Sequence, residues 1–82
     1  MLTVADATLM ARQIVAGHFK KPLDDVDAAT RLRDDLGADS LDRVFLLCEV
    51  ERLLGREITD DVAVEFETVG DAARLLTELR GR

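Results

Sequence analysis

Four helix-start signals divide this chain of 82 residues and restrict the folds that it can adopt. Two of them have a threonine followed three residues later by an aspartate, a spacing typical of capping boxes. In a third, one aspartate can cap a helix while a second one, in the first turn, is favoured by the helix dipole. The fourth is a threonine before two aspartates. In chain order, the signals begin at Thr3, Asp39, Thr59 and Thr68.

Apolar residues at helical spacing follow three of these signals. They predict a first helix from Thr3 to about Gly17, a second over residues 39–54, and a last one from residue 68 to about 80. Gly55 is expected to end the second helix. Between the first two helices, a proline and a run of aspartates are typical of a long loop.

Residues 62–66 are ambiguous, because Val62, Val64 and Phe66 alternate with other residues as in a strand. The sequence has no second strand candidate that could pair with this one, so a short helix is expected after Thr59. The predicted fold class is therefore all-α: a small four-helix bundle with three longer helices and one short helix. Residues 1–82 are expected to form one domain.

The charge of the chain argues against several classes of partner. Its formal net charge is −6, with 17 acidic residues against 11 basic ones. Nucleic acids and anionic membranes bind cationic surfaces, so neither is expected, whereas proteins with basic patches would be attracted. One cysteine and one histidine make a metal site improbable and exclude an internal disulfide. Neither a membrane-spanning segment nor a signal peptide is recognisable, which favours a cytoplasmic protein.

The second expected helix has more apolar residues than one face requires. At about 100° per residue they fall into two sets on nearly opposite sides. The first set is larger, is assigned to the core, and consists of Leu46, Leu47, Val50, Leu53 and Leu54. The second set begins beside Ser40 and consists of Leu41, Val44, Phe45 and Cys48. This second set is predicted to be a docking surface edged by Asp42, Glu49 and Glu51. The alternative is a helix that is buried on two sides, and Arg43 falls toward the core side.

Ser40 lies where an acidic loop turns into this helix, with Asp39 before it and Asp42 after it. A serine in such a place is usually a helix cap. Catalysis would require a base that activates the hydroxyl, and the neighbourhood offers only carboxylates, with the single histidine far away in the sequence. The chain is therefore not expected to be an enzyme, and Ser40 is interpreted as an attachment point that is presented to another protein.

The segment from Asp35 to Val44 resembles the signature of acyl carrier proteins. The resemblance continues in residues 51–58 and 68–72, and it covers most of the chain, from about Leu32 to Leu76. In that family, the serine of an Asp-Ser-Leu motif carries 4′-phosphopantetheine. The resemblance thus implies that Ser40, with Asp39 before it, is the cofactor-binding site.

The resemblance also implies the partners. A phosphopantetheinyl transferase would attach the arm from coenzyme A, and the thiol of the arm would hold acyl groups as thioesters. Acyl-transferring and ketosynthase-type enzymes with basic patches would then bind a carrier that works as a monomer. Their contacts on the carrier would be Leu41, Asp42, Val44, Phe45, Cys48 and Glu49. The interior that would shelter part of an acyl chain lies near Leu46, Val50, Ile58 and Phe66.

Two residues depart from the pattern of the carriers used in fatty acid synthesis. Phe45 stands where an acidic residue is usual, and Arg43 where a small or polar one is usual. They favour a specialised pathway, such as polyketide, lipid-modification or natural-product assembly, over primary fatty acid synthesis. A peptidyl carrier fits the motif less well. A different class of function also stays open: an unmodified acidic helical adaptor that recruits a partner and still works after Ser40→Ala.

Overall fold

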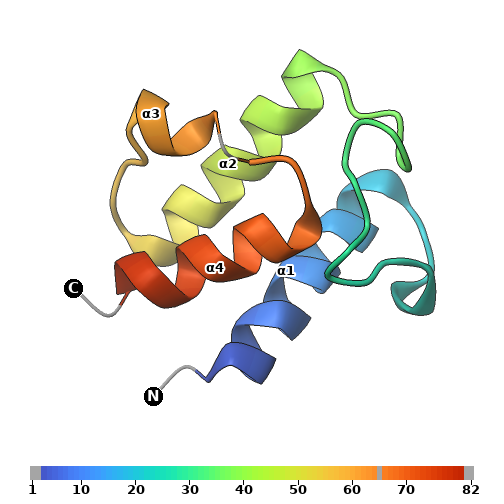
Figure 1. Cartoon of the computed structure of the whole chain (residues 1–82), viewed down its shortest axis with the longest axis horizontal. Coiled ribbons are helices and arrows are strands. Elements are labelled where there is room, and N and C mark those ends of the chain that lie inside the picture. The colour runs from blue at the N-terminus through green and yellow to red at the C-terminus, as the bar shows by residue number, and fades with distance from the viewer. Residues whose placement is uncertain (1–2, 65, 81–82) are drawn as a thin grey trace.

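The computed structural model describes residues 3–64 and 66–80, and the fold is built of helices (Figure 1). Within these residues, the elements in chain order are α1 (Val4–Phe19), the short 3-10 helix η1 (Leu23–Asp25), α2 (Ser40–Leu54), α3 (Asp60–Ala63) and α4 (Val69–Arg80). Extended backbone pairing in the described part of the chain is limited to one bridge between Arg31 and Thr68. The predicted all-α class with three longer helices and one short helix is confirmed.

The capping pairs that predicted the helix starts are present at all three longer helices. In each pair, the first side chain accepts a hydrogen bond from the backbone N–H of the aspartate three residues later, at 2.9–3.2 Å. The aspartate accepts one in return from the backbone N–H of the first residue, at 2.9–3.2 Å. Both bonds satisfy N–H groups that a helix end leaves without a partner. The pairs are Thr3 with Asp6, Asp39 with Asp42, and Thr68 with Asp71.

The end of α1 differs from the prediction. The helix continues past Gly17 to Phe19, and Lys20 caps it in the left-handed conformation with φ 55°. The N–H of Lys21 then donates to the carbonyl of Ala16 at 2.9 Å. A glycine is the usual residue in this conformation, which made Gly17 a reasonable but wrong endpoint. The longer helix places His18 and Phe19 at its last turn.

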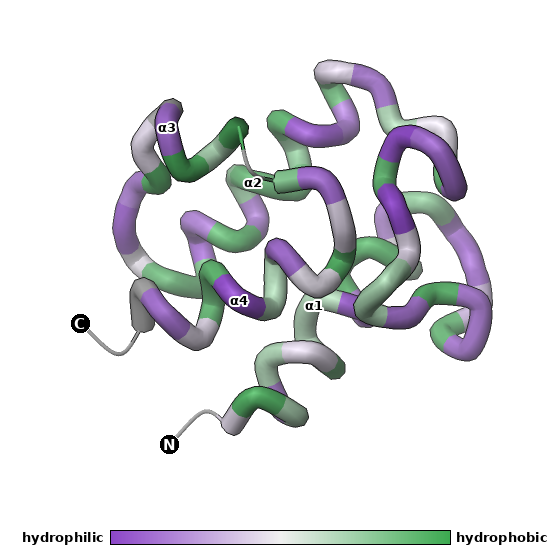
Figure 2. The backbone as a smooth tube through the Cα atoms, in the orientation of Figure 1, coloured by the Kyte–Doolittle hydropathy of each residue, from purple (hydrophilic) through white to green (hydrophobic). Residues whose placement is uncertain are grey.

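The core lies where α1, α2 and α4 pack together. Alanines of α1 let α4 approach closely, and Ala7 and Ala11 are completely buried. Figure 1 shows α4 in front of the diagonal α2 and α1 beneath them, and Figure 2 shows hydrophobic residues recurring along α2. The largest side chains in the core are Phe66, Leu32, Leu46, Leu76, Val15, Val26, Val50 and Val69. No helix in residues 3–64 and 66–80 is long and apolar enough to cross a membrane.

The long connection between α1 and α2, at the right of Figure 1, is held to both neighbouring helices. The Arg12 guanidinium of α1 donates to the carbonyls of Val26 at 2.6 Å and Leu23 at 3.0 Å. At α4, the N–H of Gly70 donates to the carbonyl of Ala28 at 2.8 Å. A Cβ at Gly70 would lie only 3.0 Å from that carbonyl oxygen, so glycine is needed for the close approach. The connection therefore delivers the start of α2 to a defined place.

Candidate functional site

Ser40 is the first residue of α2 and is exposed. The preceding turn is anchored by Ala38, which is buried and donates its N–H to the carbonyl of Leu32 at 2.9 Å. Gly37, in the same turn, adopts the left-handed conformation with φ 69°. Asp39 is the residue that caps α2. The Ser40 hydroxyl has no hydrogen-bond partner among the described residues. Ser40 is therefore not the helix cap, and its hydroxyl is accessible to another molecule.

Asp42 makes two kinds of contact in the first turn of α2. Its carboxylate accepts a hydrogen bond from the backbone N–H of Asp39 at 3.0 Å and is hydrogen-bonded to Nε2 of His18 at 2.8 Å. The backbone hydrogen bond from Asp39, followed by the one from His18, lowers the pKa of Asp42 below its ordinary value. Asp42 thus stays ionised while it holds α1 against the start of α2.

His18 is the residue of the site that sequence reasoning missed. Its ring is stacked on that of Phe45, with centroids 4.7 Å apart and planes at 25°, and it meets the edge of Phe19 at 4.8 Å. His18 and Asp42 lie 24 positions apart in the chain. No local pattern joins positions so far apart, so the sequence contains no signal that could have found this contact.

The two apolar sets of α2 have opposite surroundings. In the core set, Leu46 and Val50 are buried and the other three leucines are partly buried against the core. In the second set, Leu41 is 78% exposed, Val44 56% and Phe45 49%, and Cys48 is also exposed. The first set is therefore the core face, as predicted, the second set is an exposed outer face, and the alternative of a helix buried on two sides is wrong. Docking on this outer face stays a prediction.

The acidic edge of this outer face is narrower than the sequence predicted. Glu49 lies on it, where its carboxylate accepts a hydrogen bond from Arg52 at 2.6 Å. Glu51 instead accepts the backbone N–H of Ile58 at 2.7 Å and is half-buried. Glu51 therefore holds the connection between α2 and α3, and the edge consists of Asp42 and Glu49.

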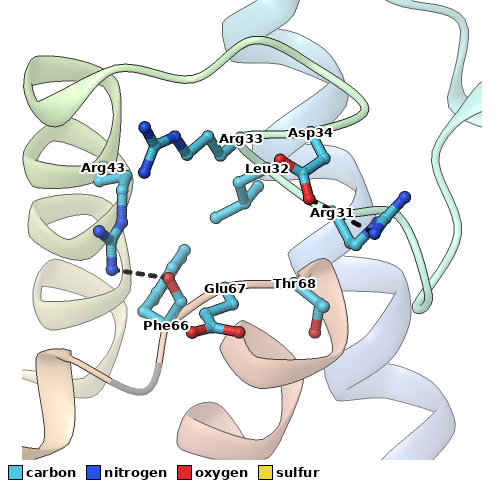
Figure 3. Close-up of a pocket in the computed structure, with 8 residues that line it drawn as sticks. All are labelled: Arg31, Leu32, Arg33, Asp34, Arg43, Phe66, Glu67 and Thr68. Atoms are coloured by element: carbon cyan, nitrogen blue, oxygen red, sulfur yellow. Dashed lines mark hydrogen bonds and ion pairs between the residues drawn. The ribbon is translucent and has the colours of Figure 1, made fainter.

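Arg43 is half-buried on the side of α2 that faces the α3–α4 connection. Its guanidinium donates a hydrogen bond to the carbonyl oxygen of Phe66 at 2.9 Å. This contact explains why a charged residue occupies the core side of the helix. It also closes one wall of a pocket of about 430 Å³ (Figure 3). The pocket is lined by Arg31, Leu32, Arg33, Asp34, Arg43, Phe66, Glu67 and Thr68.

The interior that the family resemblance marks for an acyl chain is packed. Leu46, Val50 and Phe66 are each no more than 1% exposed, and Ile58 is half-buried against them. Of these four residues, only Phe66 lines the 430 Å³ pocket. A second hollow of about 410 Å³ lies between α1 and the outer face of α2, where Gly17, His18, Phe45 and Glu49 line it together with Ile14.

The described residues contain no group of three or more histidine, cysteine, aspartate or glutamate side chains that could hold a metal ion. Around Ser40 lie the capping carboxylate of Asp39 and the hydrogen-bonded side chains of Asp42 and His18. What this arrangement offers chemically is an exposed hydroxyl at the positive end of a helix dipole, where a phosphate is favoured.

A family model described as "Phosphopantetheine attachment site" matches residues 11–76. An acyl carrier protein of Caulobacter vibrioides is 40% identical over 75 residues, which cover 92% of this chain and 96% of that protein. An acyl carrier protein of Phenylobacterium zucineum is 38% identical over 78 residues, which cover 95% of this chain and 99% of that protein. The solved structure of an acyl carrier protein from Enterococcus faecalis aligns with a TM-score of 0.75 and 32% identity, covering 93% of this chain and 96% of that one.

Proposed function

This chain belongs to the acyl carrier protein family, and we propose that Ser40 is the residue to which its 4′-phosphopantetheine group is attached. Members of this family are carriers rather than enzymes, and they hold that group covalently. The observation that carries the proposal is the exposed Ser40 hydroxyl, which has no partner among the described residues because Asp39 caps the helix. Ser40 also lies within the matched residues 11–76.

The residues at the start of α2 fit a phosphate ester. A phosphate on the Ser40 oxygen would lie at the helix start, where the dipole and the first backbone N–H groups favour negative charge. The carboxylate of Asp42 in the same turn lies within hydrogen-bond distance of Nε2 of His18, at 2.8 Å. When bound, the group supplies a thiol that holds an acyl group as a thioester at the end of a flexible arm. The protein itself needs no base, because a phosphopantetheinyl transferase provides the chemistry of attachment.

The outer face of α2 is proposed to be the surface that partner enzymes contact. Its exposed apolar residues are Leu41, Val44, Phe45 and Cys48, and its acidic edge consists of Asp42 and Glu49. Acyl carrier proteins in general bind a phosphopantetheinyl transferase and acyl-handling enzymes. For this chain we propose acyl-transferring or ketosynthase-type enzymes with basic patches, steered by the net charge of −6.

A specialised pathway, such as polyketide, lipid-modification or natural-product assembly, is proposed over primary fatty acid synthesis. The support comes from Phe45, which presents a half-exposed aromatic ring where fatty-acid carriers usually have an acidic residue, and from Arg43. A cytoplasmic location, a monomeric state and a single domain over residues 1–82 are further predictions, and they rest on the sequence.

The test of the proposal is the intact mass of the protein after incubation with a broad-specificity transferase and coenzyme A. We expect the mass of one phosphopantetheine to be added to the native chain and nothing to Ser40→Ala. Circular dichroism of both proteins serves as the control for folding. No added mass on a folded native chain would contradict the proposal and favour the unmodified adaptor.

A further inference from the structure

The hollow between α1 and the outer face of α2 is lined by one face of each helix. Its volume is about 410 Å³. On α1 the lining residues are Ile14, Gly17 and His18, which are three and four positions apart and therefore share one face of that helix. On α2 they are Phe45 and Glu49, which are four positions apart and share a face in the same way. An apolar wall, an aromatic ring and a carboxylate thus meet at one place on the surface.

Gly17 keeps this hollow open. It lies in the last turn of α1 and its φ is not positive, so the backbone there suits any residue. A Cβ at Gly17 would meet nothing within 4 Å, so packing does not require glycine either. Inside a helix, glycine even costs stability relative to alanine. A larger side chain at this position would instead occupy part of the space that Gly17 lines. The glycine therefore serves the hollow and not the fold.

Phe45 and Glu49 together offer what a flat cation requires. The Phe45 ring is held against the His18 ring, with centroids 4.7 Å apart, and is still 49% exposed. Oε2 of Glu49 accepts a hydrogen bond from Arg52 at 2.6 Å, whereas Oε1 has no donor among the described residues. The Arg52 side chain is 70% exposed, and ion pairs at the surface hold their partners weakly. The Glu49 carboxylate can therefore accept a further cation that lies over the aromatic ring.

We propose that this hollow receives an arginine side chain of a partner enzyme. The inference rests on the proposed docking of partners on the outer face of α2. A guanidinium group is planar, stacks on aromatic rings and donates hydrogen bonds to a carboxylate in a fixed fork, so it matches Phe45 and Glu49 together. A lysine ammonium is a compact, strongly hydrated charge that does not stack in this way. The net charge of −6 attracts cationic surfaces in general, whereas the hollow favours arginine among the cations that arrive.

The experiment compares three capped alanine tripeptides whose central residue is arginine, lysine or citrulline. Lysine keeps the charge without the planar group, and citrulline keeps the shape without the charge. Each peptide is titrated into the protein after treatment with a transferase and coenzyme A, and the amide NMR signals of the five lining residues are followed. Intact mass reports attachment at Ser40 separately. A chain that stays unmodified is titrated in that form, because the hollow belongs to the protein itself.

We expect saturable shifts at the lining residues, with the arginine peptide bound about fivefold more tightly than the other two. Gly17→Leu should abolish this binding without lowering the melting temperature, because leucine is the better residue inside a helix. Gln13→Leu places the same side chain at an exposed position of α1 that does not line the hollow, and it should leave binding unchanged. Stability and binding therefore respond differently to the same new residue.

A second variant tests the carboxylate without changing the shape of the hollow. Glu49→Gln should weaken binding of the arginine peptide about fivefold, because it removes the charge of the hydrogen-bond acceptor. Glu57→Gln makes the same change at an exposed residue outside the hollow and should have no effect. Equal affinities for the arginine and lysine peptides would reduce the site to a general acidic surface and overturn the proposal. Binding that survives Gly17→Leu and Glu49→Gln would overturn it as well.

Discussion

Phe45 is the single residue whose surroundings say most about the outer face of α2. Its ring is half-exposed, yet it is stacked on the His18 ring, and His18 is held in turn by Asp42. An aromatic side chain fixed in this way loses little conformational freedom when a partner covers it. Phe45 is therefore well suited to be an apolar anchor of a short-lived complex.

At this scale we predict that Phe45→Glu weakens the binding of the native partner enzyme about tenfold, since buried aromatic anchors carry much of the energy of an interface. Attachment of the arm to Ser40 should be spared. The measurement is a titration with the partner, combined with the mass of the modified product. Val4→Glu is the matched control, because Val4 is 70% exposed and lies at the far end of α1. Unchanged affinity for Phe45→Glu would contradict docking on this face.

At the scale of the elements, the backbone conformation at each glycine decides whether that glycine raises or lowers the stability of the fold. Gly17 lies within α1, while Gly37 lies in the turn before α2 with φ 69°. A Cβ would meet nothing within 4 Å at either position. The two sites therefore differ in backbone conformation and not in space.

The same substitution should consequently have opposite effects at the two sites. Gly17→Ala is expected to raise the free energy of unfolding by about 0.5–1 kcal/mol, because alanine is the better residue inside a helix. Gly37→Ala should lower it by about 1–2 kcal/mol, because the left-handed conformation is strained for alanine. Urea unfolding of the two variants and the native chain measures both. Two changes of the same sign would contradict this account of the helix end and the turn.

At the scale of the whole molecule, aspartates that accept backbone hydrogen bonds are distributed over the fold. Hydrogen bonds lower the pKa of Asp6 through Thr3, of Asp35 through Arg31 and of Asp42 through Asp39 and His18. A group whose pKa is lower in the folded state stabilises that state above its ordinary pKa of 3.8. This contribution is lost as the pH falls through the lower folded value.

We therefore expect the free energy of unfolding to fall steeply once the pH drops below about 4, as the paired carboxylates become protonated. Asp6→Asn should make this decline shallower, because it removes one titrating cap. Asp24→Asn removes the same charge from an exposed residue of η1 and should leave the decline as it is. Thermal unfolding at a series of pH values from 7 to 2.5 measures how the stability of the native chain, of Asp6→Asn and of Asp24→Asn depends on pH. If the free energy of unfolding declined with falling pH equally steeply in Asp6→Asn and in the native chain, the capping carboxylate would not be a cause of the decline.

The sequence by itself determined the starts of the three longer helices and the place of Ser40. The two residues of each capping pair, which begin at Thr3, Asp39 and Thr68, are only three positions apart, so their hydrogen bonds form within about one turn and are encoded locally. The motif around Ser40 is contiguous, and the core and outer faces of α2 follow from the helical period.

Only the tertiary structure decided how distant residues meet. The end of α1 was misjudged because Lys20, rather than a glycine, adopts the left-handed conformation. The contact of His18 with Asp42 and the gathering of Arg33, Arg43 and Phe66 around one pocket depend on the path of the long connection between α1 and α2. That path is set by hydrogen bonds to α1 and α4, between residues that no short-range pattern relates.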